Sequence, residues 1–263
     1  MDWKTIGLAG AIIFAGHFIK GISGFGSALF SVPLLMLILD VKFITPVFLL
    51  FDLMSGALLV STNWRMINRR LFLWVSVGLL GGTALGTWML LSFSHDMLKR
   101  ILGILVTGWA VFILMHSNDE NDNKNDNEND DERIHSNPGK TVSADSRAFR
   151  LAPLSGFLGG ALGAMFSVNG PPIIIYLTYI LKEKRAFRAT LYGIFFADAC
   201  YKTVLFTSQG LLNMDVARFA LMMAPFLVIG ALAGSWLQEY INQNLFRKIV
   251  AVILAITGVT LLI

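Results

Sequence analysis

The first 40 residues contain an apolar run that is too long to cross a membrane as one straight helix. It extends from Thr5 to Leu39, and its only strongly polar members are His17 and Lys20. A single α-helix of that length would measure about 52 Å, against a hydrocarbon core of about 30 Å. We therefore expect two shorter helices that form a hairpin, with the bend at Gly21–Gly26.

The other apolar runs and the composition place the chain in a lipid bilayer. Hydrophobic residues make up 55% of the sequence and charged residues only 14%, whereas soluble domains carry about 25% charged residues. Because several runs reach the length of about 20 residues that a spanning helix needs, we expect an all-α, multi-pass membrane protein rather than a soluble enzyme. The spans expected after the first hairpin are Val41–Ser61, Leu71–Leu91, Met97–Met115, Arg150–Leu181 with a second break, Phe187–Phe206, Asp215–Leu237 and Leu245–Ile263.

The two halves of the sequence repeat one another. A shift of 139 residues aligns Gly21, Gly24 and Pro33 with Gly160, Gly163 and Pro172, and a shift of 148 aligns Met66–Ile101 with Met214–Ile249 without a gap. Matched hydrophobic segments that glycine and proline interrupt indicate a transporter binding site. We therefore predict two inverted structural repeats, each a broken-helix hairpin plus three transmembrane helices.

A polar segment separates the two repeats. It is rich in Asn, Asp, Glu, Ser and Lys, with almost no apolar residues, so it cannot bury enough surface to fold. We predict a disordered, acidic and Asn-rich linker at 117–148, between a first transmembrane repeat at 1–116 and a second at 149–263. Its acids have neither the spacing nor the glycine turn of an EF-hand calcium loop.

The distribution of Lys and Arg predicts the orientation in the membrane. If each long apolar run returns to the side on which it started, most basic residues outside the spans share one face with both ends of the linker. The positive-inside rule then places the linker in the cytoplasm and both termini outside. Each half then crosses the membrane an odd number of times, so the halves are inverted and their hairpins enter from opposite faces.

The residues around the two breaks are candidates for binding an anion. A helix that starts inside the membrane presents free N–H groups and a partial positive charge, which favour an anion. Glycine and proline alone would be explained by the turn, but polar side chains accompany them. The candidate substrate-binding residues are Lys20, Ser23, Gly24, Gly26 and Ser27 at the first break and Ser167, Asn169, Gly170 and Pro171 at the second.

Ionisable side chains also lie inside the expected spans. Lys20, whose charge would cost at least about 2.5 kcal/mol at the bilayer centre, has three roles open to it: attracting the anion, pairing with Asp52, or extending to the cytoplasmic interface. Asp198 and Lys202 are four residues apart and share one helix face. For Asp52, Asp198 and Lys202 we weigh proton coupling against ion pairing, and expect ion pairing. His17 is expected to be a hydrogen-bonded packing residue rather than a titrating one.

The sequence predicts no catalytic, metal or cofactor site. Gly21-Ile22-Ser23-Gly24 matches the G-x-S-G of rhomboid-type intramembrane serine proteases, but no later span supplies a histidine base. No cluster of His, Cys and Asp has the spacing of metal ligands, which weakens the alternative of a metal-ion permease. The sequence also lacks a G-x-x-x-x-G-K-[ST] loop for ATP.

Together, these segments resemble the TauE/SafE family of sulfite exporters. The resemblance lies in three places, which are Gly21–Gly26 followed by Val32–Leu35, Gly156–Gly163 followed by Gly170–Pro172, and the glycine rows at 82/86 and 230/234. It implies a polytopic inner-membrane protein with inverted repeats that moves sulfite or organosulfur anions, usually outward. The long linker and Ser27, where family members often continue a glycine run, depart from the family pattern.

We therefore expect a secondary transporter that exports a small anion, with sulfite or an organosulfonate favoured, by alternating access. An inside-negative membrane potential would favour the exit of each negative charge by about 2.3 kcal/mol per 100 mV. The expected partners are the small anion and the lipid bilayer, with a homodimer as one open assembly and no nucleic acid. The alternative from another class is a membrane accessory or assembly subunit that does not transport.

Overall fold

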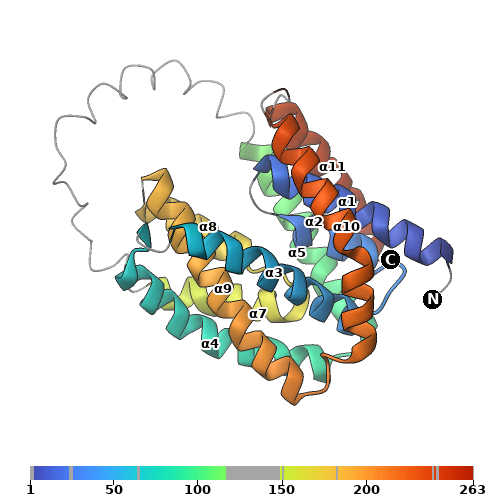
Figure 1. Ribbon diagram of the computed structural model, residues 1–263, viewed down its shortest axis with the longest axis horizontal. Coiled ribbons are helices and arrows are strands. Elements are labelled where there is room, and N and C mark those ends of the chain that lie inside the picture. The colour runs from blue at the N-terminus through green and yellow to red at the C-terminus, as the bar shows by residue number, and fades with distance from the viewer. Residues whose placement is uncertain are drawn as a thin grey trace.

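The secondary structure of the described residues is helical, without strands. The computed structural model in Figure 1 describes residues 3–23, 26–63, 66–116, 149, 151–181, 183–238, 240 and 243–262. The helices are α1 (Trp3–Ser23), α2 (Ser27–Leu35), α3 (Val41–Asn63), α4 (Arg69–Ser92), α5 (His95–His116), α7 (Ala152–Phe166), α8 (Gly170–Ile180), α9 (Lys184–Ser208), α10 (Met214–Leu237) and α11 (Gln243–Leu262). The predicted linker at 117–148 lies outside the described residues.

The helices agree with the expected spans to within a few residues at each end. Asparagine side chains cap the first turn of two of these helices. Asn68 accepts a hydrogen bond from the backbone N–H of Leu71 at the start of α4, and Asn213 accepts one from Val216 at the start of α10. Each bond satisfies an N–H group that has no acceptor within its own helix. Local capping therefore helps to set where these long apolar helices begin.

The first break forms the expected hairpin between α1 and α2. The hydroxyl of Ser31 on α2 donates to the carbonyl of Ile12 on α1 at 3.2 Å, and Ser27 lies beside Gly16. Residue numbers rise along α2 as they fall along α1, so the two helices are antiparallel. Gly26 provides the turn with a φ of 93°, which side chains other than glycine rarely adopt. Pro33 does not end the second helix at once, since α2 continues to Leu35.

The second break forms a similar hairpin between α7 and α8. Ile173 of α8 packs against Gly159 of α7, and Asn169 packs against Gly163, so these helices are also antiparallel. Ser167 ends α7 in the left-handed region, with a φ of 56°, and its N–H donates to the carbonyl of Gly163 at 2.9 Å. As expected, the two prolines after Gly170 lie in the first turn of α8, where a missing N–H is tolerated.

The helices pair between the two halves of the chain. α1 packs against α10 and α4 against α7, while α5 packs against α11 and α3 against α9. The predicted glycine rows lie at the first two crossings. A Cβ atom at Gly82 would collide with the carbonyl of Phe157, and one at Gly234 would collide with the carbonyl of Phe18. The expectation that these glycines serve close helix packing is therefore confirmed.

The outer faces of several helices are apolar. Three helices of the described chain are long and apolar enough to cross a membrane, Trp3–Ile22, Arg69–Ser92 and Met214–Leu237, and three shorter apolar stretches accompany them. Leu221 and Leu232 on α10 are more than half exposed, as are Trp88 and Trp236 at the ends of α4 and α10. Apolar side chains on the outside of a well-packed helical protein suit a lipid environment, with tryptophan near its interfaces.

The hydrophobic core consists of two clusters of buried residues. In Figure 1, α4, α7, α8 and α9 gather on one side, and α1, α2, α5, α10 and α11 on the other. The smaller cluster includes Leu79 of α4 and Ile194 of α9. The larger one includes Phe48 of α3 and Phe166, the last residue of α7. The second hairpin thus reaches the larger cluster with its tip.

Candidate anion-binding site

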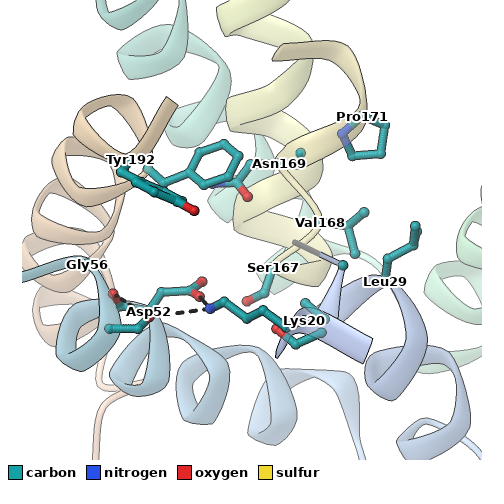
Figure 2. A pocket seen from close by; sticks show the side chains of 15 residues that line it. Lys20, Leu29, Asp52, Gly56, Ser167, Val168, Asn169, Pro171 and Tyr192 are labelled. Carbon is teal, nitrogen blue, oxygen red and sulfur yellow. Dashed lines mark hydrogen bonds and ion pairs between the residues drawn. The ribbon is translucent and has the colours of Figure 1, made fainter. Parts of the chain in front are cut away.

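The tips of the two hairpins meet at one cavity of about 70 Å³. Because a water molecule needs about 10–15 Å³ by this measure, the cavity has room for a small polyatomic ion. Segments far apart in the sequence contribute to its wall, namely both breaks and the middle parts of α3 and α9 (Figure 2). The lining residues are Lys20, Gly26, Ser27, Ala28, Leu29, Asp52, Ser55, Gly56, Ser167, Val168, Asn169, Gly170, Pro171, Tyr192 and Phe195.

Lys20 extends from the end of α1 toward α3. Its Nζ atom lies 3.9 Å from Oδ1 of Asp52 and donates to the hydroxyl of Ser55 at 3.3 Å. The two charged side chains remain partly open, at 21% and 25% exposure. Of the three roles considered for Lys20, the structure shows the contact with Asp52, although the distance is long for an ion pair. The ammonium group therefore keeps hydrogen-bonding capacity for a ligand in the cavity.

The start of α2 also faces the cavity. Gly26 precedes this helix and has no side chain to cap it. The first three N–H groups, on Ser27, Ala28 and Leu29, have no acceptor within the helix, and all three residues line the cavity. Together with Lys20, they form a side of the cavity that is rich in hydrogen-bond donors and positive in potential.

The tip of the second hairpin is fixed to α3 by two hydrogen bonds. The hydroxyl of Ser167 donates to the carbonyl of Thr45 at 3.2 Å, and the hydroxyl of Thr45 donates to the carbonyl of Met165 at 3.0 Å. The Ser167 hydroxyl proton is therefore used within the protein. Toward the cavity, the oxygen of Ser167 remains available as an acceptor, which differs from the expected role as an anion donor.

Behind the cavity lies a buried polar cluster that we call the Asp198 cluster, formed by Thr83, Gly163, Asn169, Asp198 and Lys202. The Asp198 carboxylate accepts from the Thr83 hydroxyl at 2.8 Å, from Nδ2 of Asn169 at 3.1 Å and from Nζ of Lys202 at 2.8 Å. Lys202 also donates to the carbonyl of Gly163 at 3.3 Å. Asp198 and Lys202 are only 0% and 1% exposed, so the expected ion pair is present and is structural in character.

This cluster determines how Asn169 faces the cavity. Because Nδ2 is directed at Asp198, the amide oxygen is the end that points toward the open space in Figure 2. At the start of α8, Pro171 and Pro172 have no N–H group to offer. The second hairpin thus contributes acceptors to the cavity, whereas the first hairpin contributes most of the donors.

The structure brings most of the predicted site residues together. Two candidates cannot be placed in this way, since Gly24 and the side chain of Ser23 lie outside the described residues. Asp198 and Lys202 do not line the cavity but lie directly behind it. Ser55 was not predicted as a site residue, although its position three residues after Asp52 places both on one face of α3. Tyr192 was not predicted either, and no feature of the sequence pointed to it.

His17 has the packing role that was expected. It is 2% exposed, its Nδ1 atom lies 2.9 Å from the carbonyl of Ile13, and its ring packs against Phe48 and Phe51 of α3. No group of three or more His, Cys, Asp or Glu side chains in the described parts of the chain could hold a metal ion.

Comparisons with known proteins agree with this description. The sequence model of the family described as "Sulfite exporter TauE/SafE" matches residues 8–261. The "Probable inner membrane transporter protein TsaS" of Comamonas testosteroni is 24% identical over 216 residues, which cover 81% of this chain and 80% of that protein. No solved structure matches. Because the family match extends over nearly the whole chain, the protein belongs to the sulfite exporter TauE/SafE family of multi-pass membrane transporters.

Proposed function

We propose that the protein is a secondary transporter of a small anion, with sulfite or an organosulfonate as the favoured substrate. The observation that carries this proposal is the cavity itself, where Lys20 and the uncapped start of α2 face the same space. A cation and several aligned N–H groups are what an oxyanion needs in a site shielded from bulk water.

The remaining lining residues favour an anion with a small organic part. Leu29, Val168 and Phe195 add apolar surface, and the hydroxyl of Tyr192 points into the open space in Figure 2. A sulfonate has a compact, threefold oxygen head for the donors and a carbon substituent for the apolar wall. Sulfite would occupy the donor side alone. The name of the family also refers to sulfite, and that of the relative to inner-membrane transport.

We infer that the two halves are inverted repeats that move against each other in alternating access. The pairing of helices between the halves supports this inference. In the repeat, α7 corresponds to α1 and α10 to α4, and α1 packs on α10 as α7 packs on α4. Val168 of the larger cluster and Phe195, which packs against the smaller one, both line the cavity, so rocking of one cluster against the other would open it first to one side and then to the other. In this arrangement the linker is cytoplasmic and both termini lie outside.

Direct binding to the purified protein in detergent tests the proposal. We expect sulfite, sulfoacetate and methanesulfonate to raise the unfolding temperature, while acetate and chloride at the same ionic strength have little effect. Ligand at 100 times its Kd should stabilise the folded state by about 2.7 kcal/mol. If no sulfur anion stabilises the folded protein, the alternative of an accessory subunit without transport is favoured instead.

A further inference from the structure

We propose that the protein moves its anion together with one proton, and that Asp52 is the group that carries this proton. The inference rests on the proposed function, because it assigns a second ligand to the same cavity. It starts from a feature that an anion site would not be expected to contain, namely a carboxylate in the wall beside the cation.

The charges around the cavity cancel before an anion arrives. Among the lining residues, Lys20 is the only base and Asp52 the only acid. Behind the cavity, Asp198 and Lys202 form their own pair at 2.8 Å. An anion that enters would therefore add an uncompensated negative charge to a site within the membrane, where unpaired charges are strongly disfavoured.

The ionised form of Asp52 has few stabilising partners once an anion competes for Lys20. The distance from Lys20 is already 3.9 Å. Ser55 lies one helical turn away but donates its hydroxyl proton to the carbonyl of Phe51 at 2.9 Å, so that proton is not available to the Asp52 carboxylate. An anion on Lys20 thus leaves Asp52 as a second negative charge nearby. Uptake of one proton by a carboxylate oxygen removes that charge.

No other described group near the cavity is as well placed to take the proton. On α1, His17 is buried against Phe48 and does not line the cavity. On α9, Asp198 is held by three donors, including Lys202, and Tyr192 lines the cavity but carries no carboxylate. Neither α2 nor α7 carries an acidic or basic residue, and α8 carries only the phenols Tyr176 and Tyr179, which do not line the cavity.

Proton and anion binding then favour one another, since each neutralises the charge that the other brings. The proton comes from the water on the side to which the cavity is open and leaves with the anion on the other side, and no bond of the anion changes. Each transport cycle moves the negative charge of the anion together with the single positive charge of the proton. For a monovalent sulfonate the net charge moved is zero, so a pH gradient, rather than the membrane potential expected from the sequence, drives its transport.

Methanesulfonate flux in proteoliposomes tests this inference, because this anion stays ionised near neutral pH and the proton must travel on the protein. At zero membrane potential, we expect a pH difference of one unit to drive up to tenfold accumulation of labelled methanesulfonate on the more alkaline side of the membrane. A membrane potential imposed without a pH difference should drive none. Asp52→Asn should reverse both results.

Two controls separate this inference from the proposed function. Asp215→Asn, at the exposed start of α10, makes the same chemical change away from the cavity and should keep the coupling. Asp52→Glu, which restores a carboxylate, should keep it as well. Accumulation by the pH difference in Asp52→Asn, or none in the wild-type protein despite normal exchange, would overturn the proton inference alone. If the wild-type protein exchanges no sulfur anion, the proposed function itself fails.

Discussion

At the scale of single residues, the site depends on polar side chains whose partners are inside the protein. Asp198 is the clearest case, because it holds Asn169 from one hairpin, Thr83 from α4 and Lys202 from its own helix. Lys202 in turn reaches the carbonyl of Gly163. The orientation of Asn169 at the cavity is therefore set by groups that no ligand would touch.

The pair of Asp198 and Lys202 should contribute strongly to stability as a unit. We expect Asp198→Asn and Lys202→Gln each to lower the free energy of unfolding by about 3–5 kcal/mol, because each leaves an unpaired charge in the interior. The double variant should lose less than the sum, since no buried charge remains. Unfolding of the four proteins in the same detergent measures this cycle. Strictly additive losses would show that the two side chains do not stabilise each other.

The sequence predicted many of these residues but not their roles. The spacing of Asp198 and Lys202 was enough to predict an ion pair, because four residues make one helical turn. The contact between Lys20 and Asp52 was only one of three alternatives, since 32 positions separate them and helix packing brings them together. The hydrogen bond from Thr83 to Asp198 could not be predicted from the sequence. Small polar residues also occur where they serve helix packing alone.

At the scale of helices, the breaks are the elements that make a site possible. The turn at Gly26 lets the start of α2 point its N–H groups at the cavity, and the turn at Ser167 fixes the second tip on α3. The sequence located both breaks because glycine and proline interrupt otherwise continuous apolar runs. It did not indicate that the hydroxyl of Ser167 and the Nδ2 group of Asn169 at the second break donate within the protein.

Replacement of Gly26 tests the role of the first turn. Both Gly26 and Gly210 have a positive φ, 93° and 71°, with no atom within 4 Å of an added Cβ. Gly26→Ala and Gly210→Ala should therefore each cost about 1–2 kcal/mol of stability. Only Gly26→Ala should also weaken sulfoacetate binding, because the turn at Gly210 lies between α9 and α10, outside the cavity wall. Equal binding by the two variants would argue against a site at the start of α2.

The crossing of α4 and α7 offers another matched pair of glycines. A Cβ at Gly82 would meet the backbone carbonyl of Phe157, whereas one at Gly81 meets only the ring of Phe157 at 3.7 Å. We expect Gly82→Ala to destabilise the protein by about 1–3 kcal/mol through overpacking. Gly81→Ala should be neutral or stabilise by up to about 1 kcal/mol, because alanine favours a helix. Thermal unfolding of both variants in detergent decides whether the glycine row is needed for close packing.

At the scale of the whole molecule, the proposed transport requires two halves that cross the membrane in opposite directions. The duplication could be detected in the sequence because the glycine rows and breaks recur at nearly constant shifts. The cavity could not, since it exists only where the two halves pack together, and no pattern within one half specifies that contact. The division at the linker and the inverted orientation remain predictions.

Reporter fusions test the orientation. Each half should cross the membrane an odd number of times, because its hairpin returns to the side on which it began. Fusions at Met1 and Ile263 should therefore report the outside, and a fusion within 117–148 should report the cytoplasm. A cytoplasmic signal from either terminus would contradict the inverted arrangement.

The most direct test of the central claim is exchange of a labelled sulfur anion across proteoliposomes that contain the purified protein. Exchange needs neither a potential nor a pH gradient, so it tests transport through the site alone. Our account predicts saturable exchange of labelled sulfoacetate that unlabelled sulfite inhibits. It should be lost or weakened at least tenfold in Lys20→Gln, because a charge-assisted hydrogen bond contributes about 1.5–3 kcal/mol.

Lys42→Gln is the matched control, since Lys42 donates to the carbonyl of Leu91 and does not line the cavity. It should exchange sulfoacetate like the wild-type protein. The account would be contradicted if folded wild-type protein exchanged no sulfur anion, or if Lys20→Gln and Lys42→Gln had the same activity.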